Sequence, residues 1–142
     1  IGLLADRIVN NGGLLPDDVV NEMIKQEIID DKESIGFIFD GFPRTTGQAR
    51  MLDQFLNKRG TPVTAVNHLD VPKWLAQNRI MERGKESLRK DDTLEAFPTR
   101  WNAYTKDTVP AINYFSGRGH VSVVNSENSI EEVYDEVRNI IG

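Results

Sequence analysis

The sequence predicts a single α/β domain, residues 1–142, in which helices cover a parallel sheet in an α/β/α arrangement of three layers. Three observations favour this class. Strand-like and helix-like segments alternate along all 142 residues, with no linker or repeat between them. The run 35–39 is short, continuous and apolar, which is typical of a strand buried on both faces. Hydrophobic residues make up 39% of the chain, enough to bury a core.

The composition excludes several classes of function. The chain has no cysteine, so it cannot hold a disulfide scaffold, a thiolate zinc site or a cysteine nucleophile, and it suits a reducing compartment such as the cytoplasm. Its net charge of −5 argues against general nucleic-acid binding. No apolar run approaches the roughly 18 residues of a membrane span, and no targeting segment is recognisable.

The first third of the chain predicts helices on either side of the strand at 35–39. Leu4 and Ile8 indicate a short helix that stops at Gly12-Gly13. Pro16-Asp17 opens a second helix. Its apolar face is expected to comprise Val20, Met23, Ile24 and Ile28. A third helix is predicted over 45–59, ended by Gly60.

The rest of the chain continues the alternation. A second strand is predicted at 65–70, and Asp70-Val71-Pro72 then resembles an N-cap and first-turn proline for a helix through Met81. Residues 82–92 are charged and predict an exposed loop. A long helix is expected from about 93 to 115, with Pro98 marking a kink or a late start.

The last segments are a strand and a helix. Val121 to Val124 predict the third strand. Ser129-Ile130-Glu131-Glu132 fits a capping box, which indicates a final helix through Ile141.

The most informative motif is Asp40-Gly41-Phe42-Pro43-Arg44, which follows the predicted strand at 35–39. Ligands of parallel α/β sheets bind at this end of the strands. A carboxylate there can hold Mg²⁺ through water, a glycine allows a ligand to approach the backbone, and arginine presents a planar fork to a phosphate. The alternative is an ordinary turn in which Asp40 is a cap and Arg44 is solvated.

Four arginines bracket the charged loop: Arg79, Arg83, Arg89 and Arg100. Arg79 and Arg83 are four residues apart and share a helical face. Arg89-Lys90-Asp91-Asp92 suits a cover that closes over an anionic substrate and excludes water, although a charged loop is often simply solvated. Together with Asp40 and Arg44, these arginines favour phosphoryl transfer.

Other candidates are weaker. His68 and His120 have no metal-ligand spacing and are expected to be structural, while Trp74, Trp101 and Tyr104 are expected to pack in or near the core. The chain contains no G-x-S-x-G nucleophile motif, no Rossmann glycine fingerprint and no complete P-loop.

In these motifs and their order, the chain resembles the nucleoside monophosphate kinases, and specifically the adenylate kinases. The resemblance covers essentially the whole chain. The matching residues are Gly13-Leu14-Leu15-Pro16-Asp17, Phe37 to Arg44 with Gln48, Arg79 and Arg83, Arg89-Lys90-Asp91-Asp92, Arg100 with Tyr104, Pro110, and the segment 125–133.

The resemblance implies a reversible phosphoryl transfer between Mg-ATP and AMP that yields two ADP. Asp40 would position Mg²⁺ through water, and Gln48 would hydrogen-bond the adenine of AMP. The implied catalytic residues are Arg44, Arg83, Arg89 and Arg100. The implied AMP-binding residues are Gly13, Leu14, Leu15, Gly41, Phe42, Pro43, Arg44, Gln48, Arg89 and Arg100. The implied ATP-binding residues are Arg79, Arg83 and Asn128.

The resemblance also predicts how the domain is organised. Residues 1–30 would form part of the AMP-binding region, and residues 83–92 would form the short type of lid, because only Gly84 to Leu88 separate Arg83 from Arg89. Members of the family are often monomers. Neither a nucleic acid nor a membrane is an expected partner.

Family members begin with a strand, a P-loop and a helix, followed by an arginine that grips AMP, and the match starts after these segments. We therefore expect the 142 residues to be the C-terminal part of a kinase domain, with a gap in the sheet between 35–39 and 65–70. Alone, they should transfer phosphate poorly. Two alternatives remain open: a catalytically inactive adenylate-kinase-like scaffold or binding module, and a pyrimidine nucleoside monophosphate kinase.

Overall fold

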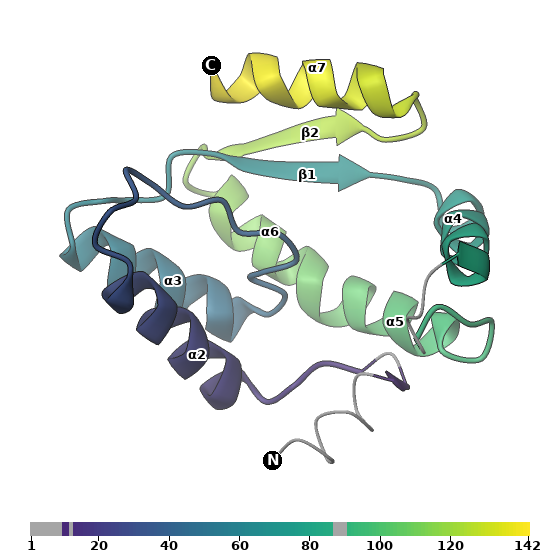
Figure 1. Ribbon diagram of the computed structural model, residues 1–142, viewed down its shortest axis with the longest axis horizontal. Helices are drawn as coiled ribbons and strands as arrows, with labels where there is room; N and C mark the ends of the chain where they lie inside the picture. The colour runs from purple at the N-terminus through teal and green to yellow at the C-terminus, as the bar shows by residue number, and fades with distance from the viewer. Residues whose placement is uncertain (1–9, 12, 87–90) are drawn as a thin grey trace.

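The computed structural model describes residues 10–11, 13–86 and 91–142. The predicted first helix, with Leu4 and Ile8, lies outside the described residues, and so does Arg89. The described elements form three layers around a small sheet (Figure 1). Helix α7 (Ile130–Ile141) covers one face of the sheet, and α3 (Thr46–Lys58) and α6 (Val109–Ser116) lie below the other. This confirms the predicted α/β/α class.

The sheet consists of β1 (Val66–Asp70) and β2 (Val121–Asn125), which run parallel. Val66 pairs with Val121 at one end and Asp70 with Asn125 at the other. Both strands lie where the apolar runs predict them. Their carboxyl ends therefore meet at one edge of the sheet, which is the edge that binds ligands in parallel α/β folds.

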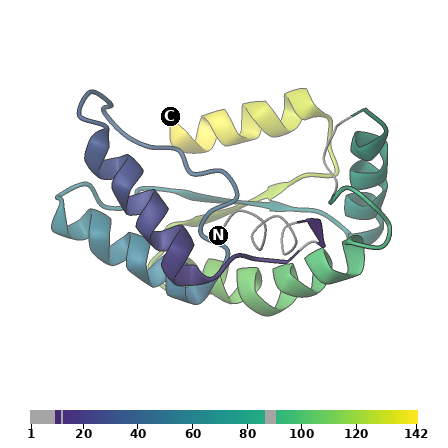
Figure 2. The same ribbon diagram turned by 60° about the horizontal axis from the view of Figure 1, so that its bottom comes forward.

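The strand predicted at 35–39 is wrong, because within the described chain these residues form no strand. They follow an irregular path between α2 and α3 (Figure 2), and Ile35 and Ile38 are almost fully exposed. An apolar run becomes a strand only where a neighbouring strand accepts and donates its backbone hydrogen bonds. No described strand lies beside 35–39, so the pattern alone could not produce one.

Helices α2 (Asp17–Asp30) and α3 pack together through one apolar cluster of buried residues, Ile28, Leu52 and Leu56. Met23, which was expected on the buried face of α2, is 61% exposed instead. Thr45 caps α3 by accepting a hydrogen bond from the Gln48 amide. After α3, Gly60 adopts a positive φ of 75°, a conformation that glycine allows without strain.

Helix α4 (Lys73–Glu86) extends beyond the Met81 at which it was predicted to end. Glu82, Arg83 and Lys85 are good helix formers, so their charge does not prevent the helix from continuing. The prediction of an exposed loop is also wrong for Asp91 and Asp92, which are both buried. Trp74, expected near the core, is 61% exposed on this helix.

The long helix predicted from 93 to 115 is divided into three parts. Helix α5 (Phe97–Ala103) starts late, with Pro98 in its first turn, and it continues into the π-helical turn η1 (Tyr104–Thr108) and then α6. Pro110 is the second residue of α6 and lacks the amide hydrogen of a regular helix. A second apolar cluster joins α6 to α3 through Ala49, Ala111 and Phe115.

Helix α7 begins with the predicted capping box, in which Ser129 and Glu132 each accept a hydrogen bond from the other residue's backbone amide. The helix ends at Ile141, as predicted. None of the helices in the described part of the chain is both long enough and apolar enough to span a membrane.

Candidate active site

A cavity of about 1810 Å³ lies between the irregular segment 35–44 and the strand β1. Its lining is mostly apolar, but it also includes the turn 40–44, Gln48 and Arg100. It is larger than the roughly 300–1,000 Å³ of most small-molecule sites, so a ligand would fill only the part near the convergent polar groups. The two polar networks described below border it.

The turn 40–44 brings a guanidinium against the backbone. Gly41 has a φ of 69°, and Arg44 Nε donates a 2.6 Å hydrogen bond to the Gly41 carbonyl. The positive φ favours glycine at position 41, and a Cβ there would lie 2.6 Å from Arg44 Nη2, so a larger residue would also have to displace the guanidinium. Thr108 Oγ1, at the end of η1, donates to the Arg44 carbonyl at 3.0 Å and ties the turn to the opposite helix.

Gln48 is 3% exposed, and its side-chain amide is the centre of an amide network formed by Asp17, Arg44, Thr45 and Gln48. The Arg44 backbone N–H donates to Gln48 Oε1 at 2.7 Å. Gln48 Nε2 donates to Asp17 Oδ1 at 3.0 Å, and Thr45 Oγ1 donates to Asp17 Oδ2 at 2.7 Å. The network joins the first turn of α2 to the first turn of α3.

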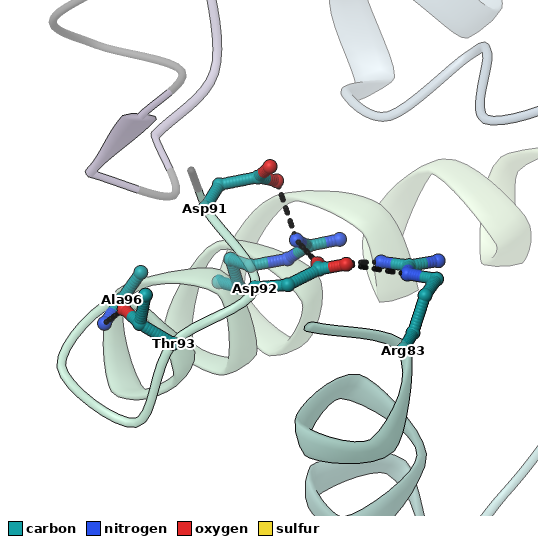
Figure 3. A network of polar contacts seen from close by, with 6 residues as sticks. Arg83, Asp91, Asp92, Thr93 and Ala96 are labelled. Atoms are coloured by element: carbon teal, nitrogen blue, oxygen red, sulfur yellow. Dashed lines mark hydrogen bonds and ion pairs between the residues drawn. The ribbon is translucent and has the colours of Figure 1, made fainter. Parts of the chain in front are cut away.

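An arginine network connects α4 to α5 through Arg83, Asp91, Asp92 and Arg100 (Figure 3). Arg83 Nε and Nη2 donate to the two oxygens of Asp92 at 2.6 and 2.7 Å, which is a bidentate pair. Arg100 Nη1 donates to Asp91 Oδ2 at 2.5 Å and to Asp92 Oδ1 at 3.1 Å.

The electrostatics of this network centre on Asp92, whose side chain is fully buried. A buried carboxylate is costly unless it is paired, and Asp92 is paired with two guanidinium groups. Hydrogen bonding to Asp92 raises the pKa of Arg83 above its ordinary value, so this side chain remains a cation. Asp92 therefore holds the two arginines near each other.

The backbone around Asp92 is held by its neighbours. A Cβ at Gly84 of α4 would collide with the Asp92 carbonyl, so the close approach of this segment to α4 requires glycine. In the turn that precedes α5, Thr93 Oγ1 accepts a hydrogen bond from the Ala96 amide at 3.1 Å (Figure 3). These contacts position the acids between the two helices.

Tyr104 and His68 form a third polar contact at the cavity, with Tyr104 Oη 2.8 Å from His68 Nε2. Burial, and then the negative charge of Asp70, raise the pKa of Tyr104 above its ordinary value. The phenol is therefore neutral at physiological pH. His68 thus has a hydrogen-bond partner in the fold, in keeping with the structural role expected for it.

The cavity gathers most, but not all, of the residues predicted to form the site. The predicted residues that line it are Gly13, Leu14, Leu15, Asp40, Gly41, Phe42, Pro43, Arg44, Gln48 and Arg100. Arg79, Arg83 and Asn128 are exposed and are not part of its lining. Arg83 is nevertheless connected to Arg100 through Asp92.

In the described part of the chain, no group of three or more His, Asp or Glu side chains could enclose a metal ion. Asp40 is exposed at the cavity and offers a single carboxylate. One carboxylate with water and substrate phosphates is a common donor set for Mg²⁺, so the residues present fit this ion.

Sequence reasoning did not predict the partners that hold the site residues. Asp17 was interpreted only as the start of a helix, yet it fixes the Gln48 amide. Asp91 and Asp92 were interpreted as part of an exposed cover, yet they hold Arg83 and Arg100. The adjacent acids between two arginines were a possible signal, because buried acids need cationic partners.

Comparisons with known proteins agree with these features. The family model described as "Adenylate kinase" matches residues 1–120. The adenylate kinase of Deinococcus deserti is 38% identical over 143 residues, which cover 96% of this chain and 72% of that protein. The adenylate kinase of Methylorubrum populi is 37% identical over 147 residues, covering 99% of this chain and 74% of that protein.

A third relative, the adenylate kinase of Parabacteroides distasonis, is 35% identical over 141 residues, which cover 99% of this chain and 74% of that protein. The matches to these relatives extend over nearly the whole chain, whereas the family model ends before β2. The chain belongs to the adenylate kinase family of phosphotransferase enzymes.

Proposed function

We propose that this chain binds AMP in the cavity beside the turn 40–44 and takes part in phosphoryl transfer between Mg-ATP and AMP. The observation that carries the proposal is the position of Arg44, Asp40 and Arg100 around one largely apolar cavity. Apolar walls suit a base and cations suit phosphates, and this cavity offers both.

The AMP side of the proposal uses the residues nearest the turn. The backbone of 13–15 and the side chain of Gln48 would contact the adenine, while Gly41 and Arg44 would contact the phosphate. Phe42 and Pro43 complete this wall of the cavity. Residues 1–30 would then belong to the AMP-binding region of a single domain over 1–142.

The phosphoryl side of the proposal uses the arginines. Arg83, Arg89 and Arg100 would surround the transferring group, and Arg79 with Asn128 would contact the base of ATP. In the transfer, the bond from the γ-phosphorus to the β–γ bridging oxygen breaks while a bond to an AMP phosphate oxygen forms. Guanidinium groups placed around the equatorial oxygens stabilise this transition state.

Mg²⁺ would be held by Asp40 through water and would neutralise phosphate charge during the transfer. In the same proposal, residues 83–92 act as a short lid that excludes water from the reacting groups. The arginine network supports this role, because it joins both ends of that segment.

The experiment is a nucleotide titration followed by an assay. Calorimetry with AMP, CMP and UMP tests the acceptor, and a coupled assay with Mg-ATP and AMP tests ADP formation. We expect AMP to bind more tightly than either pyrimidine nucleotide. Arg44→Ala should weaken AMP binding by about tenfold or more, while Arg50→Ala, which removes an exposed arginine of the nearby helix α3, should not.

Two results would replace this proposal. Tighter binding of CMP or UMP would identify a pyrimidine nucleoside monophosphate kinase. Nucleotide binding without ADP formation, even after addition of a peptide carrying a P-loop, would favour a binding or scaffold module. Absence of any nucleotide binding would contradict the proposed site itself.

A further inference from the structure

The buried amide of Gln48 has only one orientation that satisfies its neighbours. The Arg44 backbone N–H can only donate, so it requires Oε1 on its side. The Asp17 carboxylate can only accept, so it requires Nε2 on the other side. In the flipped orientation, Nε2 would face the Arg44 N–H, which is also a donor, and Oε1 would face the Asp17 carboxylate, which is also an acceptor. The two contacts together therefore assign oxygen and nitrogen without ambiguity.

Asp17 is itself held in place through both of its oxygens. Oδ2 accepts from Thr45 Oγ1 at 2.7 Å while Oδ1 accepts from Gln48. Gly47 lies against the same carboxylate, since a Cβ there would collide with Oδ2. The α2–α3 apolar cluster keeps the two helix starts together. The carboxylate therefore has a defined position 31 residues away from the amide that it contacts.

The fixed amide retains hydrogen-bonding capacity toward the cavity that it lines. Nε2 has a second hydrogen and Oε1 has a second lone pair. A 6-aminopurine presents a donor (the amino group) beside an acceptor (N1), whereas a 6-oxopurine presents an acceptor (O6) beside a donor (N1–H). The two bases therefore need opposite orientations of the same amide.

We infer that Asp17 is a positioning residue that fixes the Gln48 amide and thereby selects 6-aminopurine over 6-oxopurine nucleotides. This inference rests on the proposed function of the cavity as a nucleoside monophosphate site. Asp17 does not need to touch the base, because it acts through Gln48. Without Asp17, only the Arg44 N–H still favours the native orientation of the amide, so the flipped orientation becomes more populated and selectivity falls while the pocket keeps its shape.

The first experiment compares AMP with IMP, which differs from it at the 6-position and in the proton on N1. Calorimetric Kd values are measured for the wild-type chain, Asp17→Ala, Asp17→Asn and the control Asp18→Ala. Asp18 is an exposed acid in the same helical turn, so its removal changes the charge equally. We expect Asp17→Ala to reduce the AMP preference by about tenfold, as expected for one buried hydrogen bond.

Asp17→Asn provides the rescue that a purely structural role does not predict. The asparagine Oδ1 can still accept from Gln48 Nε2, and its Nδ2 can donate to Thr45 Oγ1, which also accepts. We expect this variant and Asp18→Ala to keep the wild-type preference. Loss of preference in Asp17→Asn to the same extent as in Asp17→Ala would contradict the inference.

The second experiment needs no nucleotide. Hydrogen exchange of the Gln48 side-chain amide is followed by NMR, and we expect it to be at least about tenfold faster in Asp17→Ala than in the wild type or in Asp17→Asn. If the wild-type chain binds neither AMP nor IMP, the proposed function fails. The inference fails separately if exchange is unchanged in Asp17→Ala, or if exchange accelerates but the AMP preference persists.

A variant that adds one methyl group covers the case in which Asp17→Ala does not fold. Gly47→Ala keeps every polar group and raises helix propensity, but its Cβ displaces the Asp17 carboxylate. We expect a folded protein with faster Gln48 amide exchange and a reduced AMP preference. Wild-type values of both quantities in Gly47→Ala would overturn the inference.

Discussion

The two polar networks that border the cavity are built from different groups and can respond to a ligand in different ways. The arginine network joins two cations to two acids, and each long guanidinium group has several donors. Such a group can exchange a carboxylate for a phosphate oxygen without leaving a charge unpaired. The amide network instead joins a neutral amide to partners that each fit only one of its atoms. The arginine network is thus suited to follow a moving phosphoryl group, and the amide network to recognise one base.

The largest effect is expected from breaking the centre of the arginine network. Asp92→Ala removes the fully buried carboxylate that binds both Arg83 and Arg100. The arginine side chains left behind are 45% and 23% exposed and can be solvated, so the loss of these charge-assisted hydrogen bonds should lower the free energy of unfolding in urea by about 1.5–3 kcal/mol. The matched control is Glu95→Gln, an exposed acid in the same segment, which should stay near the wild type.

Asp92→Asn separates charge from shape in the same test. It keeps an acceptor oxygen for one arginine but removes the negative charge that balances two cations. We expect a stability between those of the wild type and Asp92→Ala. Equal stability of all three proteins would mean that the network contributes nothing to the fold.

The next effect concerns the arginine that reaches the cavity. Arg100 lines it and Arg83 does not, although both bind Asp92. If Arg100 stabilises the transition state directly, Arg100→Ala should lower kcat by about 100-fold or more, with a smaller change in KM for AMP. Arg138→Ala, an exposed arginine on α7, is the control. A kcat within a few-fold of the wild type in Arg100→Ala would remove this residue from the proposed mechanism.

The strand pattern shows how far sequence reasoning extends in this fold. The runs at 65–70 and 121–124 correctly predict β1 and β2, and the same kind of run at 35–39 does not form a strand. Local residue pattern determines which segments can be strands, but pairing depends on a neighbour that the segment itself does not encode. Helix caps, unlike strand pairing, depend on local sequence alone, because Thr45 and Ser129 each accept a hydrogen bond from within one helical turn.

The site was predictable to a similar extent. The turn 40–44, Gln48 and Arg100 are motif residues, and the fold brings them to one cavity. The partners of these residues were not predictable, because Asp17 and Gln48 are 31 residues apart and meet only through helix packing. Charge in the segment before α5 indicated exposure, but pairing with Arg83 and Arg100 outweighs the cost of burying Asp92.

A smaller effect separates the role of Thr45 as a helix cap from its role in the amide network. Thr45→Ala removes the cap of α3 and the hydroxyl that holds Asp17, while Ser129→Ala removes the cap of α7, far from the turn 40–44 in the sequence. Each cap should contribute about 1 kcal/mol to stability, measured by thermal unfolding. Only Thr45→Ala should also weaken AMP binding. Equal AMP affinity in the two variants would indicate that the amide network does not depend on Thr45.

The smallest effect is expected at high pH and concerns Tyr104, which belongs to neither network. Burial raises its pKa in the folded chain, so above pH 10 the unfolded chain loses the phenol proton first. The stability that Tyr104 contributes is present below pH 10 and is lost as pH rises through its folded-state pKa. Tyr104→Phe should therefore make the alkaline fall in stability less steep, although Tyr114, whose pKa is also raised by burial, retains part of it.

The same variant loses the hydrogen bond to His68, which should lower stability at neutral pH by about 1 kcal/mol. The two consequences have opposite signs, so the stability curves of the wild type and Tyr104→Phe should approach each other as the pH rises above 10. Urea denaturation between pH 7 and pH 11 measures this convergence, with the exposed Tyr134→Phe as the control. Parallel curves would mean that Tyr104 ionises equally in both states. The contact with His68 would then be a hydrogen bond whose contribution to stability does not change between pH 7 and pH 11.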